Sequence, residues 1–141
     1  MSTCVFCQIA SQAVPASIVF EDQQSLAFLD HRPLFPGHCV LIPRQHVDTL
    51  VDVPPQLLAH LSANARLLAI AIEKALGAEG TFIAINNRVS QSVPHLHIHV
   101  VPRTKGDGLK GFFWPRHKYQ SPEHMEEVRS VLAQAMKEIR G

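Results

Sequence analysis

The pattern of hydrophobic and polar positions divides the chain into short strands on either side of one long helix. Five runs rich in β-branched and aromatic residues are bounded by turn formers, at Ser17–Glu21, Ser25–Leu29, His38–Ile42, Thr81–Asn86 and about Leu96–Val101. Strand pairs interrupted by a single helix are typical of an α+β domain with a mainly antiparallel sheet.

Two helices are predicted from apolar residues that recur at helical spacing. The apolar positions of the long helix are Leu57, Leu61, Leu68, Ile72 and Leu76. We expect Asp52 to cap this helix and Gly77 to end it. In the C-terminal helix, Ser121 is the expected cap and Pro122 the first residue. Its apolar stripe is Met125, Val128, Leu132, Ala135 and Ile139.

Length and composition indicate one globular domain, residues 1–141. A chain of 141 residues, 46% hydrophobic and 18% charged, buries a real core and is not disordered. Thirteen basic and twelve acidic side chains leave a net charge of +1, so we expect neither a nucleic-acid nor a membrane partner. An odd cysteine count and the lack of an export signal predict a cytoplasmic protein.

The positive charge is concentrated in one stretch of the sequence. Between Arg103 and Lys118 there are five cations, with Asp107 as the single acidic residue. Such a local excess favours a small anion as the partner over a long polyanion.

Three histidines alternate with apolar residues in the last predicted strand. On a strand, the period of two places His95, His97 and His99 on one face. Each imidazole has a donor and an acceptor to satisfy, so three in a row are costly unless they have a function. The row is therefore the candidate reactive site.

Two chemistries can use such a row. In one, the imidazoles bind a catalytic zinc ion that keeps a position open for water. In the other, a neutral imidazole attacks phosphorus while its neighbours orient it and supply protons. The second is favoured because Asn86, Gln91 and Ser92 are neutral donors suited to a phosphoryl group. In addition, residues 80–105 contain no carboxylate base for a water-activating metal.

The segment His95–Arg103 closely resembles the histidine-triad (HIT) motif, H-x-H-x-H followed by apolar residues. Further matching segments occur in the family's order, at Val19–Asp22, Ala27–Asp30, Pro36–His38, Leu41–His46 and Gln91–Val93. The likeness covers about residues 4–103, which leaves residues 104–141 as a specificity loop and a C-terminal helix. It implies the HIT fold, in which two five-stranded sheets of a homodimer join into one ten-stranded sheet. It also implies hydrolysis or transfer of nucleotides through a nucleotidyl-histidine intermediate.

The resemblance assigns roles to residues of this chain. It makes His97 the nucleophile on the α-phosphorus, with His99 and His38 beside it in the catalytic site. Further residues would bind a purine nucleotide or dinucleotide substrate: Asp30 at the ribose, Asn86, Gln91 and Ser92 at the phosphate, and Phe6, Ile9 and Phe28 in an apolar slot for the base. Plain core packing is the alternative for the three apolar residues, and a turn-starting role is the alternative for Asp30.

The Cys4-Val5-Phe6-Cys7 segment is open to three interpretations: a redox pair, buried unpaired thiols or half of a metal site. Members of the family with this N-terminal pair resemble zinc proteins. By that resemblance, Cys4, Cys7, His46 and His95 bind one structural Zn²⁺ per chain. A Cys₂His₂ set is closed and non-catalytic, and it would leave His97 uncharged and available as the nucleophile.

An aromatic loop follows the triad. Trp114-Pro115 is similar to a Trp-Pro pair that reaches the partner subunit's active site in related proteins. Nearby Lys105, Lys110 and Arg116 suit a substrate with more than one phosphate, which favours dinucleoside polyphosphates over phosphoramidates. One departure from the family lies before the triad, where Ser90 stands at a position that is usually glycine.

The expected function is therefore hydrolysis or transfer at the α-phosphate of a purine nucleotide conjugate, an AMP phosphoramidate or a dinucleoside polyphosphate. Three alternatives stay open at this point. They are a nucleotide-binding or scaffolding protein with incidental catalysis, a hydrolase that uses the triad to hold catalytic zinc, and a dinucleoside polyphosphate phosphorylase.

Overall fold

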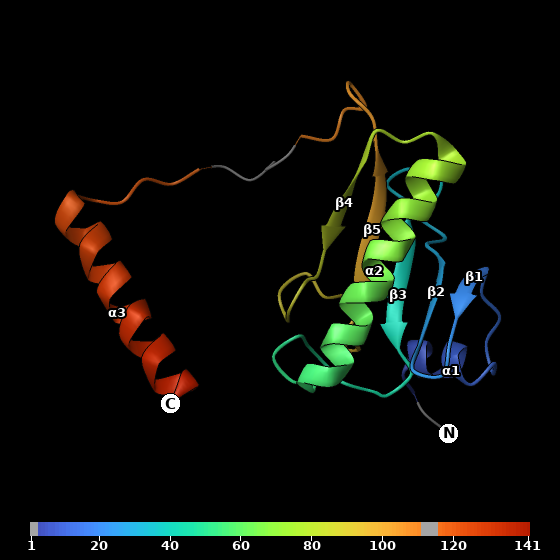
Figure 1. Ribbon diagram of the computed structural model, residues 1–141, viewed down its shortest axis with the longest axis horizontal. Helices are drawn as coiled ribbons and strands as arrows, with labels where there is room; N and C mark the ends of the chain where they lie inside the picture. Colours follow the sequence, from blue (N-terminus) through green and yellow to red (C-terminus); the bar gives the residue numbers. More distant parts are fainter. Residues whose placement is uncertain (1–2, 111–115) are drawn as a thin grey trace. The chain divides into compact units, whose positions relative to one another are not determined.

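The computed structural model describes residues 3–110 and 116–141, in two units, Met1–Asp107 and Gly108–Gly141. The first unit contains a five-stranded sheet with the order β1-β2-β3-β5-β4 (Figure 1). Its strands are β1 (Ile18–Glu21), β2 (Ser25–Leu29), β3 (Cys39–Pro43), β4 (Gly80–Ala84) and β5 (Ile98–Arg103). Every neighbouring pair is antiparallel, so the prediction of an α+β fold with an antiparallel sheet is confirmed.

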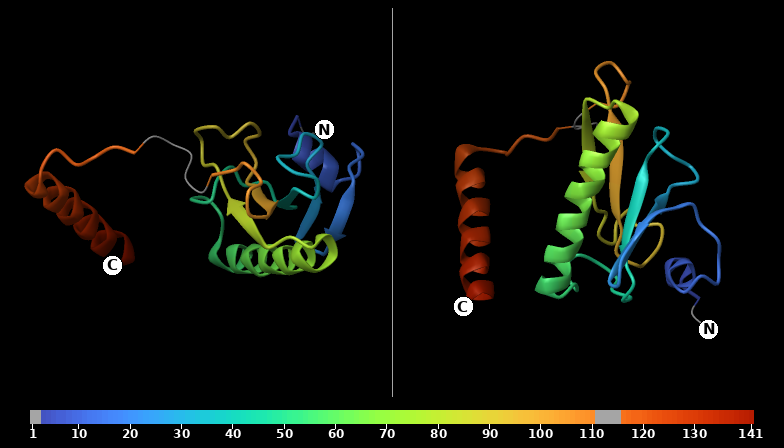
Figure 2. Two further views of the ribbon diagram at one scale, coloured as in Figure 1. Left: turned by 90° about the horizontal axis from the view of Figure 1, so that it is seen from above. Right: turned by 45° about the vertical axis from the view of Figure 1, so that its right-hand side comes forward.

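Helix α2 (Pro55–Leu76) covers one face of the sheet (Figure 2, left). Its buried side packs in one cluster with residues of β3 and β5, among them Leu61, Leu68, Leu41 and Val100. Gly77 ends the helix in the left-handed region, at φ 67°, as predicted.

The prediction that Asp52 caps α2 is wrong. The N-cap is Pro54, which has no side-chain donor or acceptor. Asp52 closes the preceding turn instead, because its Oδ2 accepts both the backbone N–H and the hydroxyl of Thr49, at 3.1 and 2.7 Å. A carboxylate that is engaged in its own turn is not free to cap the helix that follows.

A short helix that the sequence pattern does not reveal, α1 (Val5–Ala10), lies on the opposite face of the sheet (Figure 2, left). Six residues are too few to display a helical period. Cys4 is its N-cap, and the Cys4 Sγ accepts the backbone N–H of Cys7 at 3.4 Å. Ile9 anchors the helix in a cluster of buried residues from β2 and β3: Leu26, Phe28, Val40 and Ile42.

The register of β5 determines which face of the sheet each side chain from His95 to Val100 occupies. Leu96, Ile98 and Val100 are buried in the cluster under α2. His99 is paired with Val40, a member of the cluster on the α1 face. Side chains alternate along extended chain, so His97 and His99 belong to the α1 face. The strand begins at Ile98, two residues later than predicted, and His95 and His97 therefore lie in the segment that enters it.

The second unit contains α3 (Pro122–Arg140), which begins as predicted: the Ser121 Oγ accepts the N–H of His124 at 3.0 Å. None of the described residues of α3 is buried, and its apolar stripe includes exposed Met125, Leu132 and Ile139. Among the described residues, no helix has both the length and the hydropathy to cross a membrane.

Candidate functional site

The middle histidine of the row has one nitrogen engaged and one available. The Nδ1 of His97 lies 2.7 Å from the carbonyl oxygen of His95. A carbonyl oxygen only accepts hydrogen bonds, so the neutral His97 ring carries its proton on Nδ1. The lone pair is then on Nε2, which is the form of imidazole that attacks an electrophile.

The neighbouring histidine has the opposite arrangement. The backbone N–H of Leu34 donates to His38 Nδ1 at 3.1 Å, which places the proton of neutral His38 on Nε2. His38 Nε2 then donates to His99 Nδ1 at 3.0 Å. The proton of His99 is therefore on Nε2, and the ring is a donor on its outer side.

Burial keeps both rings of this pair uncharged at neutral pH. Burial lowers the pKa of His38, and the nearby carboxylate of Asp30 only partly opposes it. For His99, burial together with repulsion from His97 and His38 lowers the pKa to about 4. The centroids of the His97 and His99 rings are 5.0 Å apart. A ring with a lone pair on Nε2 and a ring with an N–H donor on Nε2 are thus neighbours.

The structure brings Asp30 to this group of histidines. The Asp30 Oδ2 is 3.7 Å from His38 Nε2, while Oδ1 accepts the N–H of Arg32 at 2.9 Å. Asp30 therefore both begins a turn and lies beside the histidines. Asn86 follows β4 and is half-buried.

Gln91 is engaged within the loop that precedes the triad. Its side-chain amide donates to the carbonyl of Asp48 at 2.6 Å and accepts the N–H of Arg88 at 2.8 Å. Ser90 adopts φ 62° in the same loop, so a non-glycine residue occupies the left-handed region. Ser92 is exposed.

The apolar residues predicted to form the base slot lie together on the α1 face. Phe6 meets Phe28 edge-on with ring centroids 5.5 Å apart, and Ile9 belongs to the same cluster. Phe6 also meets the His97 ring edge-on at 5.1 Å. His97 is only 4% exposed, and aromatic rings from Phe6 and His99 stand against it. Trp114, the last predicted substrate residue, lies outside the described residues.

The four predicted metal ligands converge at the N-terminus of α1. The ligand atoms of Cys4, Cys7, His46 and His95 all lie within 4.8 Å of one another. The Nδ1 of His95 is 3.3 Å from Cys4 Sγ and 3.6 Å from Cys7 Sγ, and His46 Nδ1 is 3.2 Å from Cys7 Sγ. With ordinary Zn–S and Zn–N bond lengths, the edges of a zinc tetrahedron measure about 3.3–3.8 Å. The observed spacing therefore fits a zinc ion.

The protons of both metal-facing histidines are held on the far side of the ring. His95 Nε2 donates to the carbonyl of Pro43 at 2.9 Å, and His46 Nε2 donates to the carboxylate of Asp48 at 2.8 Å. Each Nδ1 therefore carries a lone pair on the side of the thiols, which is the arrangement that metal-binding histidines require. Burial also lowers the pKa of His95, despite the opposing Pro43 hydrogen bond, and so keeps it neutral.

A second group of possible ligands does not present the lone pairs that a metal ion requires. It consists of Asp30, His38 and His99. The Nδ1 of His38 accepts the Leu34 N–H, so its proton is on Nε2, the nitrogen that would have to bind the ion. The cluster of Cys4, Cys7, His46 and His95 is thus the candidate metal centre, and the histidines around His97 are left for other chemistry.

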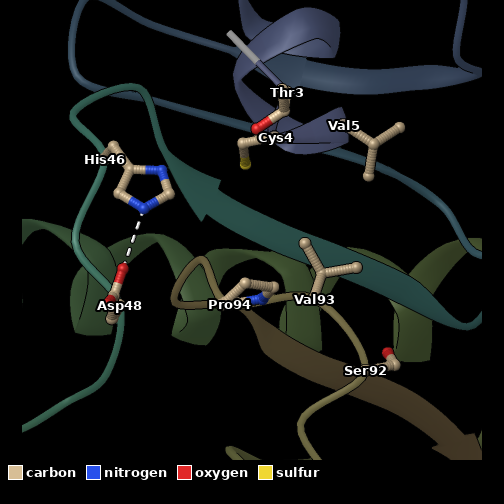
Figure 3. Close-up of a pocket in the computed structure, with 8 residues that line it drawn as sticks. All are labelled: Thr3, Cys4, Val5, His46, Asp48, Ser92, Val93 and Pro94. Carbon is tan, nitrogen blue, oxygen red and sulfur yellow. Dashed lines mark hydrogen bonds and ion pairs between the residues drawn. The ribbon is translucent and has the colours of Figure 1, made fainter.

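A pocket of about 440 Å³ lies beside the metal centre (Figure 3). Figure 3 shows the His46–Asp48 hydrogen bond on one side of the His46 ring and Cys4 on the other. The pocket is lined by Thr3, Cys4, Val5, His46, Asp48, Ser92, Val93 and Pro94. Ser92 thus borders the metal side of the site.

Sequence reasoning missed two residues of this region. Asp48 has a recognisable signal, an acidic residue two positions after a candidate ligand histidine. Leu34 has none, because it acts through its backbone N–H, which every residue except proline possesses.

Comparisons with known proteins agree with this architecture. The HIT domain family matches residues 11–106. An uncharacterised HIT-like protein of Saccharolobus solfataricus is 34% identical over 139 residues, 96% of this chain and 99% of its own. An adenylylsulfatase of Arabidopsis thaliana is 37% identical over 75% of this chain and 55% of its own. An asymmetrical bis(5'-nucleosyl)-tetraphosphatase of Schizosaccharomyces pombe is 35% identical over 67% of this chain and 53% of its own.

Solved structures extend the likeness to the fold and to the metal. A HIT family protein of Bacillus subtilis superimposes with a TM-score of 0.84 at 29% identity, covering 94% of this chain and 96% of that one. A Zn-bound histidine triad family protein of Mycobacterium smegmatis superimposes with a TM-score of 0.73 at 38% identity, covering 96% of each chain.

Proposed function

The chain belongs to the HIT domain family, and on that premise we propose that it is a nucleotide hydrolase or nucleotidyltransferase whose nucleophile is His97. The observation that carries this proposal is the pair of complementary tautomers. His97 presents a lone pair on Nε2, and His99 beside it presents an N–H. Attack on phosphorus needs a nitrogen lone pair, and departure of the leaving group needs a hydrogen-bond or proton donor at its oxygen.

The proposed reaction proceeds in two displacements at the α-phosphorus. In the first, His97 Nε2 forms a bond to phosphorus and the bond from phosphorus to the leaving group breaks. The His97 Nδ1–H faces the His95 carbonyl oxygen, whose negative end stabilises the positive charge that develops on the ring. His99 Nε2–H donates to the leaving-group or phosphate oxygen. In the second displacement the oxygen of water, or of another acceptor, forms a bond to phosphorus and the bond from phosphorus to His97 Nε2 breaks. The acceptor gives up its proton, and His97 regains its lone pair and is neutral again.

The same tautomers oppose the alternative in which the row itself binds a catalytic metal. A ligand nitrogen must carry a lone pair toward the ion. The Nδ1 of His99 accepts from His38, so its outer Nε2 carries a proton and not a lone pair. His95 faces the cysteines on the other side.

The proposed substrate is a purine nucleotide conjugate, such as an AMP phosphoramidate or a dinucleoside polyphosphate. Phe6, Ile9 and Phe28 would hold the base, and Asp30 the ribose hydroxyls. Asn86, Gln91 and Ser92 would contact the phosphate, with the Gln91 amide exchanging its bond to Asp48 for one to the substrate. The two relatives that are named as hydrolases of adenylyl sulfate and of dinucleoside tetraphosphates support this class, since both substrates carry a nucleotidyl group on a variable leaving group.

We further propose one structural zinc ion per chain, held by Cys4, Cys7, His46 and His95. Bound there, zinc would cross-link the N-terminus of α1, the segment after β3 and the segment before β5. Two thiolates and two imidazoles complete its coordination, so the reaction is assigned to the protein's own histidines. Maintaining such thiolates fits a reducing, cytoplasmic location.

The proposed active form is a homodimer with a ten-stranded sheet. The strand order leaves β4 at an edge, and Ile83 in that strand is 46% exposed. Leu67 and Ile70 on α2 are exposed large apolar residues as well. An edge strand beside exposed apolar side chains favours pairing with a second copy. Residues 104–141 are proposed to complete a single functional domain as a specificity loop and helix.

The proposed function is tested by trapping the intermediate. Protein mixed with an AMP phosphoramidate, diadenosine tetraphosphate or adenylyl sulfate is quenched at alkaline pH and analysed by peptide mass spectrometry. We expect an AMP adduct on the peptide that contains His97. Turnover without any adduct on this residue would contradict the proposed nucleophile. Parallel reactions with and without inorganic phosphate separate a hydrolase from a phosphorylase, because phosphate would then replace water in the product.

A further inference from the structure

We propose that Phe6 is a positioning residue for His97 and that the metal centre sets the place of Phe6. The inference rests on the proposed nucleotide site and goes beyond it, because it links that site to an ion that never touches the substrate. The link is the short helix α1: Cys4 is its N-cap, Cys7 lies within it, and Phe6 lies between the two cysteines.

Helix α1 depends on its attachments. An isolated helix shorter than about 12–15 residues is not stable in water, and α1 has six. At its C-terminal end, Ile9 is buried in the sheet and Arg44 Nη1 donates to the carbonyl of Ala10 at 3.1 Å. At its N-terminal end, the polar attachments are Cys4, the N-cap, and Cys7, one turn further on, beside the ring contact of Phe6 with Phe28. The two ends are therefore secured by different means.

The metal decides how firmly the N-terminal end is held. Without an ion, the contacts of the two cysteines with the ligand histidines are sulfur–nitrogen hydrogen bonds of 3.2–3.6 Å, and thiols are weak partners in such bonds. Zinc would replace these weak contacts with coordination bonds to all four ligands. Loss of the ion is expected to loosen the first turn of α1 while Ile9 and Arg44 retain the last.

Phe6 lies in that first turn and stands against the nucleophile. Its ring meets the His97 ring at 5.1 Å and 80°, and the ring of the metal ligand His95 at 5.8 Å and 81°. It also meets Phe28 at 5.5 Å, so it belongs to the proposed base slot. Because edge-on aromatic pairs have a preferred geometry, a displaced Phe6 would release the His97 ring and widen the slot together.

Zinc binding and nucleotide binding are expected to be thermodynamically coupled. If the ion strengthens nucleotide binding by some factor, nucleotide binding must strengthen zinc binding by the same factor. For a contact of this kind we expect a factor of about 10, within the common range of coupling between sites. AMP is a suitable probe because it has no leaving group on its phosphate and does not turn over.

The experiment measures AMP affinity by calorimetry in zinc-loaded and zinc-free protein, and zinc affinity by chelator competition with and without AMP. The same four measurements are made on Phe6→Ala and on Val5→Ala, a matched truncation of a half-exposed neighbour on α1. We expect the coupling factor to fall from about 10 toward 1 in Phe6→Ala and to persist in Val5→Ala. Zinc affinity without AMP should be nearly the same in all three proteins.

Two further measurements separate positioning from a general loss of structure. Cys4→Ser removes a thiolate ligand but retains a good N-cap, so it should weaken AMP binding as zinc removal does. In protein with labelled histidines, Phe6→Ala should shift the His97 ring resonances while zinc is still bound. The amide spectrum of the β-sheet should stay the same in every sample.

The outcomes distinguish this inference from the proposed function. Failure of zinc-loaded wild-type protein to bind AMP contradicts the proposed function. AMP binding with equal affinity in zinc-loaded and zinc-free protein contradicts the inference alone. So does a coupling factor that is as large in Phe6→Ala as in the wild type, or a His97 ring resonance that Phe6→Ala does not move.

Discussion

The Nε2–H of His38 donates to Nδ1 of His99 at a distance of 3.0 Å, and this bond determines which nitrogen of His99 carries the proton. The direction of the bond is set in turn by the Leu34 N–H, which occupies the other nitrogen of His38. His99 therefore acts as a hydrogen-bond donor, next to a His97 ring that carries a free lone pair. Predictions about each residue follow from this arrangement.

Replacing the nucleophile should abolish turnover without unfolding the protein. We expect His97→Ala to lower kcat by about 10⁴-fold or more, because the substitution removes the nitrogen proposed to form the nucleotidyl bond. The zinc content and the thermal unfolding transition should stay close to those of the wild type. Initial rates of AMP release check this, with His124→Ala on α3 as a histidine control that should retain full rates. Wild-type rates in His97→Ala would refute the assignment.

Removing His38 should impair the donor role of His99 and leave the nucleophile intact. In His38→Ala, the Nδ1 of His99 loses its donor and the ring is free to place its proton on either nitrogen. We expect kcat/KM to fall by about 10²-fold for a substrate with a basic leaving group. With a leaving group that needs no proton, the fall should be much smaller. Equal losses for the two substrates would show that His38 does not act through His99.

The metal centre should contain about one zinc ion per chain and depend on Asp48. Asp48 accepts from the Nε2–H of the ligand His46, so Asp48→Ala should weaken zinc affinity by about 10- to 100-fold. Elemental analysis and chelator competition measure both quantities, with Glu127→Ala on α3 as an acidic control. A zinc-free protein, purified without chelator, would contradict the assignment. Activity that vanishes as soon as chelator is added, while AMP still binds, would favour catalytic zinc.

Asp22 should govern stability in acid. Burial opposes its ionisation, but hydrogen bonds from Gln24, Asn64, His60 and Ser25 outweigh burial and hold its pKa well below the usual 3.8. A lowered pKa means that ionised Asp22 stabilises the fold above the pKa of the unfolded chain, and that this contribution is lost as the pH falls below about 4. Asp22→Ala should lower the free energy of unfolding at pH 7 by about 2 kcal/mol.

The difference in stability between wild type and Asp22→Ala should shrink as the pH is lowered from 5 to 2. Chemical denaturation at a series of pH values measures this difference. A constant difference over that range would contradict the assigned ionisation.

Glycine at position 90 should stabilise the loop before the triad. Ser90 has φ 62°, a conformation that costs a residue with a Cβ about 1–2 kcal/mol and glycine almost nothing. Glycine also loses more conformational entropy on folding than serine, which offsets part of this gain. We therefore expect Ser90→Gly to raise the free energy of unfolding by about 0.5–1 kcal/mol. Ser62→Gly, in the middle of α2, is the control and should destabilise by a similar amount. Destabilisation by both substitutions would contradict the strain at position 90.

The sequence by itself determined the features that depend on near neighbours. The alternation from His95 to Val100 placed imidazoles and apolar side chains on opposite faces, and Gly77 and Ser121 marked the ends of helices. The motif around His97 also identified the family, because its residues are contiguous.

Only the tertiary structure decided the state of each histidine and the place of α1. His95 is paired with a carbonyl 52 residues away and faces a thiol 91 residues away, and His99 accepts from a ring 61 residues away. The proton of an imidazole goes to whichever nitrogen meets an acceptor, and such partners are assembled by the sheet and not by local sequence. Helix α1 follows the same rule, because six residues have no helical stability of their own and take their position from the ligands and the core that hold them.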